Sequence, residues 1–212
     1  MEFLPESIDQ YVHNHTSPES ELLADLNRET WAKILIPRML SGHLQGRVLS
    51  MFSHLMKPKR VLEIGTYTGY SALCLAEGMP EGSQLHTIDI NEELEDFVKK
   101  YVERSGHSDK IIQHIGNAME IIPNLDEKWD LVFIDADKEN YLNYYNMIID
   151  RMNPGGLILC DNVLWSGKVV DENETDEETA TLRALNKAIL EDSRVENVLL
   201  PVRDGLMAAR VL

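Results

Sequence analysis

Between residues 60 and 161, short apolar runs alternate with stretches of helical character, and this alternation limits the folds open to the chain. The apolar runs, which are bounded by Gly, Asp or Pro, are 60–64, 84–88, 111–115, 130–134 and 157–160. The helical stretches that follow them are 70–77, 91–105, a turn near Met119, 141–152 and 177–190. Such alternation is typical of a parallel sheet covered by helices on both faces. We therefore expect an α/β fold with a doubly wound, mostly parallel sheet.

The two ends of the chain break this pattern. Residues 195–202 and 206–211 are both strand-like, and the Asp-Gly pair between them predicts a hairpin that closes the sheet with an antiparallel pair. The first 59 residues have helical patterns, with a helix start expected at Ser17-Pro18-Glu19. A chain of 212 residues suits one domain. We expect a single domain over 1–212, in which 1–59 form a helical cap and 60–212 the α/β core.

Charge and composition exclude several classes of protein. The net charge of −16 argues against non-specific nucleic-acid binding, which requires a basic face. No apolar run approaches the ~20 residues that span a membrane, and the N-terminus does not resemble a signal peptide. Cys74 and Cys160 lie in apolar segments and are expected to be buried free thiols, which favours the cytoplasm. The acidic run 171–178 is expected to be a solvated loop or helix start rather than a cation site.

A glycine loop follows the first apolar run. Gly65 and Gly69 permit a tight turn and a close approach by a ligand, but Tyr67 occupies the position of the middle glycine in a dinucleotide fingerprint. The loop therefore suits a nucleoside ligand without a pyrophosphate. The next run ends in Asp89, about twenty residues after Gly69, where a carboxylate can accept both hydroxyls of a ribose. The alternative role for Asp89 is to cap the following helix.

Two later runs end in polar side chains, Asp135 after one and Asp161-Asn162 after the next. Adjacent strands lie roughly 5 Å apart, so these oxygens meet if the two strands are neighbours. Such ligands suit a hard cation, Mg²⁺ first, with Mn²⁺ or Ca²⁺ as alternatives. Taken alone, Asp135 could cap a helix and Asp161-Asn162 could form a turn. Lys138 lies one helical turn after Asp135 and, beside a cation that favours its neutral form, could act as a general base; otherwise it is a surface lysine.

These segments together resemble the cation-dependent S-adenosylmethionine O-methyltransferases, the family that contains catechol O-methyltransferase and the plant caffeoyl-CoA enzymes. The resemblance covers nearly the whole chain and is closest to the bacterial, caffeoyl-CoA-like branch. It rests on VLEIGTYTGYSA, TIDI, GNA, FIDADKENYLNYY, GGLILCDNVLWSG and the terminal DGL. It implies the Rossmann-like class I methyltransferase fold, with S-adenosylmethionine and Mg²⁺ as cofactors.

The resemblance also implies roles for individual residues. Glu63 would hold the methionine amino group of the cofactor, Ser71 its carboxylate and Asp89 its ribose. The other cofactor positions are Ser41, Gly65, Thr66, Tyr67, Ala118 (at the adenine) and Asp135. The metal ligands would be Asp135, Asp161 and Asn162. Lys138, with Asp135 beside it, would be the catalytic base, and Trp165 and Ser166 would contact the acceptor. Plant relatives usually carry Asn at the position of Ser166, which leaves the acceptor open.

The function expected from these features is methyl transfer to a hydroxyl of a small phenol with vicinal hydroxyls. A phenol has a pKa near 10, and a bound metal lowers it. An alternative that keeps the chemistry is a tRNA hydroxyuridine O-methyltransferase. Two further alternatives are less favoured. Tyr67 in the glycine loop argues against an NAD-linked oxidoreductase. The acidic ends of the two strands and Lys138 argue against a module that binds the cofactor without catalysis, because binding alone needs neither. The family implies a homodimer.

Overall fold

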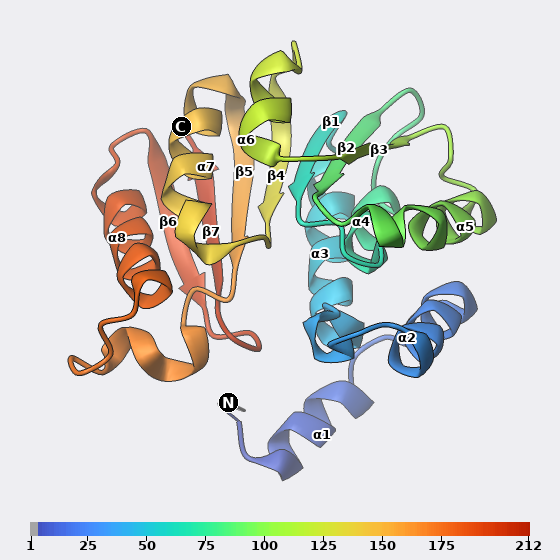
Figure 1. The fold of residues 1–212 in the computed structure, drawn as a ribbon, viewed down its shortest axis with the longest axis horizontal. Helices are drawn as coiled ribbons and strands as arrows, with labels where there is room; N and C mark the ends of the chain where they lie inside the picture. Colours follow the sequence, from blue (N-terminus) through green and yellow to red (C-terminus); the bar gives the residue numbers. More distant parts are fainter. Residues whose placement is uncertain (1–3) are drawn as a thin grey trace.

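The computed structural model describes residues 4–212, which form a seven-stranded sheet with helices on both of its faces (Figure 1). The strands are β1 (Arg60–Ile64), β2 (Gln84–Asp89), β3 (Ile111–Ile115), β4 (Trp129–Ile134), β5 (Met152–Asp161), β6 (Val195–Leu200) and β7 (Leu206–Val211). Their order is β3-β2-β1-β4-β5-β7-β6. The pairs from β3 to β5 are parallel, whereas β7 runs antiparallel to both β5 and β6. The predicted fold class and its antiparallel C-terminal pair are confirmed.

Eight α-helices connect and cover these strands within residues 4–212. They are α1 (Glu6–Asn14), α2 (Glu21–Lys33), α3 (Gly42–Met56), α4 (Tyr70–Ala76), α5 (Glu95–Ser105), α6 (Ala118–Ile121), α7 (Tyr141–Ile148) and α8 (Glu177–Glu191). Short 3-10 turns are η1 (Pro37–Met39), η2 (Glu92–Leu94), η3 (Ile122–Asn124), η4 (Lys138–Asn140), η5 (Ile149–Arg151) and η6 (Trp165–Val170). No helix in this part of the chain has the length and apolar character needed to span a membrane.

Alternate residues of each central strand enter different cores, because successive side chains of a strand point to opposite faces. Val61 of β1 packs with α2, α3, α4 and α5, whereas Leu62 and Ile64 pack with α6, α7 and α8. The same division holds in β4 for Phe133 and Ile134. Each fully buried side chain of this size contributes about 1.5–3 kcal/mol. Burial on both faces explains why successive residues of these two strands are mostly apolar.

The helices before β1 differ in how they join the sheet. Leu23 and Leu26 of α2 belong to the core around α4, and Ser53 of α3 donates a hydrogen bond of 2.5 Å to the Leu75 carbonyl. Helix α1 lies at the edge of the molecule, and none of its residues 6–14 is buried (Figure 1). The division of the chain into a cap over 1–59 and a core over 60–212 stays a prediction.

One expected helix start is wrong. Helix α2 begins after Ser20, whose hydroxyl accepts the Leu23 amide at 3.3 Å, and not at Ser17-Pro18. The preceding Glu19 accepts a hydrogen bond from the Tyr70 hydroxyl of α4 instead of entering a first helical turn. A tertiary contact therefore moves the helix start by several residues.

Two other expectations are confirmed. Cys74 and Cys160 are buried and free. The acidic run 171–178 is exposed or half-buried, and its Asp176 caps α8 by accepting the Thr179 amide at 3.0 Å.

A pair of histidines bridges β2 and β3 on the α6 side of the sheet. Nδ1 of His86 lies 2.9 Å from Nε2 of His114, and the edge of Trp129 packs against His86. A hydrogen bond between two ring nitrogens needs one donor and one acceptor, so both rings cannot be charged at once. Burial lowers the pKa of both histidines, and for His86 the His114 and Arg60 charges lower it further while Glu127 opposes them.

We expect this pair to destabilise the protein in acid. The folded state depresses the histidine pKa, so the unfolded chain binds more protons, and the free energy of unfolding falls as the pH drops below about 6.5. The variant His86→Phe should show a shallower fall over this range, measured by urea unfolding at several pH values. His15→Gln, which removes an exposed histidine, is the control. Equal pH dependence in wild type and His86→Phe would contradict the assignment.

Candidate active site

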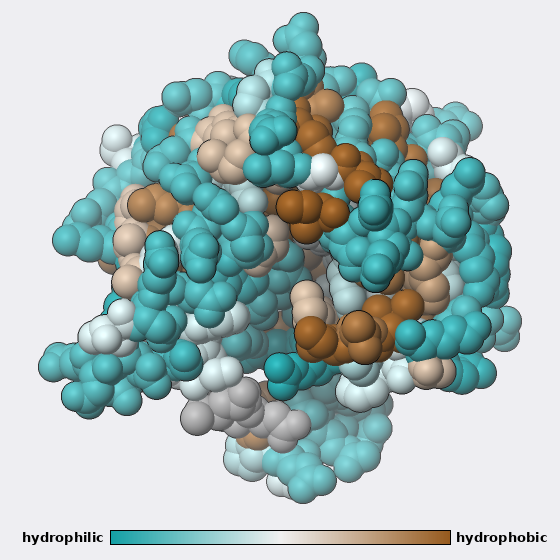
Figure 2. Space-filling model, viewed as in Figure 1, coloured by the Kyte–Doolittle hydropathy of each residue, from teal (hydrophilic) through white to brown (hydrophobic). Residues whose placement is uncertain are grey.

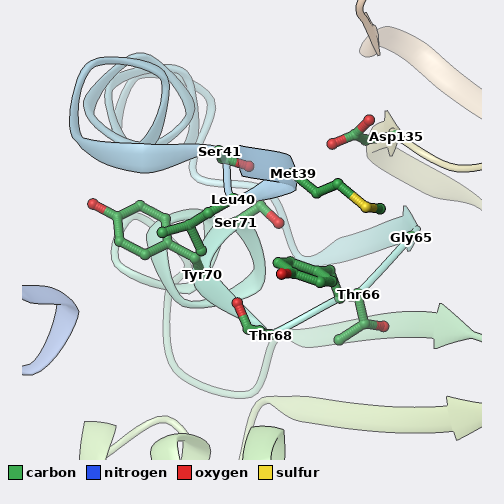
Figure 3. A pocket seen from close by; sticks show the side chains of 10 residues that line it. Met39, Leu40, Ser41, Gly65, Thr66, Thr68, Tyr70, Ser71 and Asp135 are labelled. Carbon is green, nitrogen blue, oxygen red and sulfur yellow. The ribbon is translucent and has the colours of Figure 1, made fainter. Parts of the chain in front are cut away.

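A pocket opens where β1 and β4 end. Its lining comes from the segment before α3, from the glycine loop after β1 and from the end of β4 (Figure 3). The lining residues are Met39, Leu40, Ser41, Gly65, Thr66, Tyr67, Thr68, Tyr70, Ser71 and Asp135. Apolar side chains gather beside a hollow near the middle of the face seen in Figure 2. Six of the predicted site residues, Ser41, Gly65, Thr66, Tyr67, Ser71 and Asp135, thus surround one pocket.

Gly65 is required by its contact with β4. Its backbone has φ of +101°, and a Cβ added there would lie 2.0 Å from the carbonyl oxygen of Asp135. The Asp135 amide in turn donates to the Ile64 carbonyl at 2.8 Å. Any side chain at position 65 would therefore push the end of β4 away from β1. The glycine loop and the acidic strand end are held together by this close backbone approach.

Glu63 is a buried carboxylic acid beneath the glycine loop. One of its oxygens accepts the Thr87 hydroxyl at 2.5 Å, and the other, Oε1, has no hydrogen-bond partner among residues 4–212. Burial raises the pKa of Glu63 to about 8; the charges of Asp135 and Asp89 add to this rise, and the hydroxyls of Ser71 and Thr87 oppose it. A buried acceptor without a donor suits a ligand that brings an N–H group. The amino group of a methionine moiety meets that need.

Asp89, at the end of β2, fixes the glycine loop. Its Oδ2 accepts the Tyr67 amide at 2.6 Å and its Oδ1 accepts the Asn91 amide at 2.9 Å. The helical turn that follows is capped by Asn91, not Asp89. Because each carboxylate oxygen has two acceptor sites, Asp89 keeps capacity for ligand hydroxyls. Ala118 is the buried first residue of α6 after β3 and, like Asp89, is not part of the pocket lining.

The two strands that end in acidic residues are neighbours, which is the condition under which the sequence predicts that these side chains meet. Strands β4 and β5 are parallel, and Ile134 pairs with Cys160, so Asp135 and Asp161 follow in the same row. Asp161 is buried, and burial together with the Asp135 charge raises its pKa to about 7, against the effects of Gln45, Lys138 and Arg203.

The donor set at these strand ends is two carboxylates and one amide. The Asn162 backbone is left-handed, with φ of 59°, and its N–H donates to Asp161 at 2.8 Å. No group of three or more His, Cys, Asp and Glu side chains in residues 4–212 has a metal-binding arrangement. Asn162 is outside those four types, and its amide oxygen is a suitable third ligand for a hard cation. A buried carboxyl whose pKa is raised partly by the charge of a neighbouring carboxylate fits a site for a dication.

Lys138 is not a surface lysine, since it is only 6% exposed. Its Nζ donates to Asp135 Oδ1 at 3.1 Å, to the Ala136 carbonyl at 3.0 Å and to the Tyr141 hydroxyl at 2.5 Å. It also lies 5.8 Å from the centre of the Trp165 ring. The Asp135 side chain pairs with Lys138 and does not cap a helix, because the residue at the cap position of η4 is Asp137.

The proposed acceptor residues lie in a strained segment. Trp165 and Ser166 have φ of 48° and 53°, a left-handed conformation that is unfavourable for these residues. The Ser166 amide donates to Asp204 at 2.6 Å, which ties this segment to the turn between β6 and β7. In this segment, the face of the Trp165 ring is next to Nζ of Lys138.

Two residues of this region were missed from the sequence, Gln45 and Arg203. Gln45 is buried in α3 and donates to Asp161 at 2.7 Å, while Arg203 donates to Gln45 at 2.9 Å. The sequence held one signal for Gln45: it is a polar residue at a position that the helical period assigns to the buried face of the helix, one turn before Leu49. Arg203 gave no signal, because it lies in a turn where charged residues are common.

Comparison with known proteins identifies the family. A family model described as O-methyltransferase matches residues 13–212. "Caffeoyl-CoA O-methyltransferase 5" of Nicotiana tabacum is 36% identical over 204 residues, which cover 91% of this chain and 85% of that protein. The predicted resemblance to caffeoyl-CoA O-methyltransferases is thus confirmed.

Solved structures agree with the family assignment. The O-methyltransferase from Bacillus cereus in complex with SAH superposes with a TM-score of 0.90 at 28% identity, covering 97% of both chains. TomG of Streptomyces achromogenes, involved in tomaymycin synthesis and solved in complex with SAM, gives a TM-score of 0.89 at 27% identity, covering 97% and 96%. The Rossmann-like methyltransferase fold and the predicted enzyme class are confirmed, and this chain belongs to the O-methyltransferase family.

Proposed function

We propose that this protein uses S-adenosylmethionine and a divalent cation to methylate a hydroxyl of a small catechol-type acceptor. The observation that carries the proposal is the meeting of Asp135, Asp161-Asn162 and Lys138 beside the glycine-loop pocket. The relatives support it, because the caffeoyl group in their names carries vicinal hydroxyls and the solved neighbours hold SAM or SAH.

In this proposal, residues in and next to the pocket share the recognition of the methyl donor. Glu63 offers a buried acceptor to the amino group, and Ser71 a hydroxyl to the carboxylate. Gly65 lets the donor approach the backbone, and Asp89 keeps acceptor capacity for ribose hydroxyls. The remaining proposed contacts are Ser41, Thr66, Tyr67 and Asp135, which line the pocket, and Ala118, which does not line it and is proposed from the family resemblance.

Asp135, Asp161 and Asn162 would hold the cation, Mg²⁺ first, with Mn²⁺ or Ca²⁺ as alternatives. When bound, such an ion supplies a positive charge that acidifies an acceptor hydroxyl and orients a vicinal diol. Lys138 would take the proton of that hydroxyl. The oxygen bonds to the donor's methyl carbon as the carbon–sulfur bond breaks, and the electron pair stays on sulfur. Trp165, next to Lys138, would wall the acceptor site, and Ser166 would contact the acceptor.

The protein's main contribution in this scheme is to position the two substrates. Holding two reactants in near-attack geometry can lower a barrier by up to ~7–11 kcal/mol. The net charge of −16 disfavours tRNA as the acceptor. A homodimer and a cytoplasmic location stay predictions from the sequence.

Replacing Glu63 by Gln should weaken binding of S-adenosylhomocysteine by about 10- to 100-fold, because a charge-assisted hydrogen bond is lost. In the wild type, affinity should rise between about pH 6 and about pH 8, since Glu63 with a pKa of about 8 must ionise to pair with the ammonium group. Titration calorimetry measures both effects. The pH dependence should disappear in Glu63→Gln, and its persistence there would assign it to another group.

Removing divalent cations should abolish methylation of a catechol such as caffeate, and added Mg²⁺ should restore it. The expectation follows from Asp161, whose buried carboxyl is next to the Asp135 charge and suits a dication. The measurement is transfer of labelled methyl with and without EDTA. Binding of S-adenosylhomocysteine in EDTA serves as the control for an intact pocket. Undiminished turnover in chelator would eliminate the metal role.

The variant Lys138→Met should lose about 100- to 10,000-fold in kcat, the usual contribution of a general base, with the affinity for S-adenosylhomocysteine retained. Steady-state kinetics and calorimetry measure the two quantities. Lys187→Met, which removes an exposed lysine of α8, is the matched control. A kcat close to that of wild type would assign the proton transfer to another group.

A further inference from the structure

The turn between β6 and β7, residues 201–205, contacts two segments of the proposed site, residues 40–45 and residues 164–166. On one side, Arg203 donates to the carbonyls of Leu40 and Ser41, which line the pocket, and to the side chain of Gln45. On the other side, the neighbouring Asp204 accepts the Ser166 amide through its side chain and the Leu164 amide, at 2.9 Å, through its carbonyl.

The backbone of Arg203 is unusual. Its φ of 50° lies in the left-handed region, which turns normally fill with Gly or Asn. The backbone therefore gives no reason for an arginine at this position. Its side chain does, because one nitrogen, Nη1, serves three oxygens of the segment from Leu40 to Gln45.

The contact with Arg203 decides which end of the Gln45 amide faces Asp161. Arginine only donates, so the amide oxygen of Gln45 must face Arg203, at 2.9 Å. The amide nitrogen must then face Asp161, and it donates to Oδ2 at 2.7 Å. Without Arg203, Gln45 could turn over and present its oxygen to the carboxylate, which would repel it.

The Gln45 amide in turn holds the Asp161 carboxylate. Oδ2 receives Gln45 and Oδ1 receives the Asn162 amide at 2.8 Å, so both oxygens are held and each keeps one acceptor site free. Asp161 and Gln45 are both buried, so water does not replace a lost partner readily. The free acceptor sites are therefore fixed in direction before any ligand binds.

We propose that Gln45 and Arg203 are positioning residues for the divalent cation: Arg203 orients the Gln45 amide, and the amide holds Asp161 in the orientation that binds the ion. This inference rests on the proposed function. Arg203 also has a second effect. Its hydrogen bonds to the Leu40 and Ser41 carbonyls hold the part of the pocket lining that precedes α3, and the Gln45 side chain makes no hydrogen bond to these carbonyls.

The test measures binding rather than turnover. The probe is Mn²⁺, and its binding is measured by titration calorimetry and electron paramagnetic resonance. Gln45→Met keeps the side chain's length and removes its amide, and Arg203→Met removes the donor. Both should bind Mn²⁺ about 10- to 100-fold more weakly, the usual effect of removing a partner of a metal ligand. Affinity for S-adenosylhomocysteine should fall in Arg203→Met and stay unchanged in Gln45→Met.

Three further variants sharpen the test. Arg203→Lys keeps a hydrogen-bond donor at this position. It should therefore bind Mn²⁺ more tightly than Arg203→Met does, and it can be measured even if one of the Met variants does not fold. In the double Met variant, the loss should be smaller than the product of the single losses, because both act through one amide. Arg151→Met is the matched control, since Arg151 also donates to two backbone carbonyls, those of Ile122 and Glu127.

The outcomes separate the inference from the proposed function. If the wild type binds Mn²⁺ and the folded Gln45→Met and Arg203→Met variants bind it as tightly as the wild type does, the positioning role is overturned while the metal site stands. A wild type that binds no Mn²⁺ overturns the metal site and the inference with it. Equal losses in Arg151→Met would show a general loss of stability and would also overturn the inference.

Discussion

The parallel pairing of β1, β4 and β5 is the constraint on which the site depends. Parallel strands end at the same edge of a sheet, so the residues that follow them are brought together whatever their distance in sequence. The register aligns Ile64 with Ile134 and Ile134 with Cys160, so that the next residues, Gly65, Asp135 and Asp161, form one row. The glycine in this row lets the backbones come close enough for one pocket to contact both the loop and the acidic strand end.

The same pairing concentrates negative charge. Glu63 and Asp161 are buried, and each has its pKa raised by burial and by the charge of Asp135. Like charges held together in a low dielectric destabilise the protein, and only Lys138 among the groups described pairs directly with Asp135. A bound cation would relieve this repulsion, and this is the electrostatic reason for proposing a positively charged donor and a dication at this site.

Much of the fold and part of the site could be predicted from the sequence. The apolar runs gave the strands because burial on both faces demands them, and Asp-Gly before Leu206 gave the terminal antiparallel pair. The start of α2 was misplaced because Glu19 is held by Tyr70, a contact between residues far apart in sequence. Gln45 and Arg203 were missed for the same reason, since their partners lie 116 and 158 positions away along the chain.

The sequence by itself determined the succession of strands and helices along the chain, the presence of a glycine loop after the first strand and the residue types proposed to carry the chemistry. These follow from local rules: side-chain periodicity, the conformational freedom of glycine and the chemistry of each functional group. Only the tertiary structure decided that Asp135 and Asp161 are neighbours in one row, that Lys138 is buried against Tyr141 and that a turn from the far end of the chain holds Gln45. Those facts depend on strand order, register and burial, which arise from packing between distant segments and leave no local pattern.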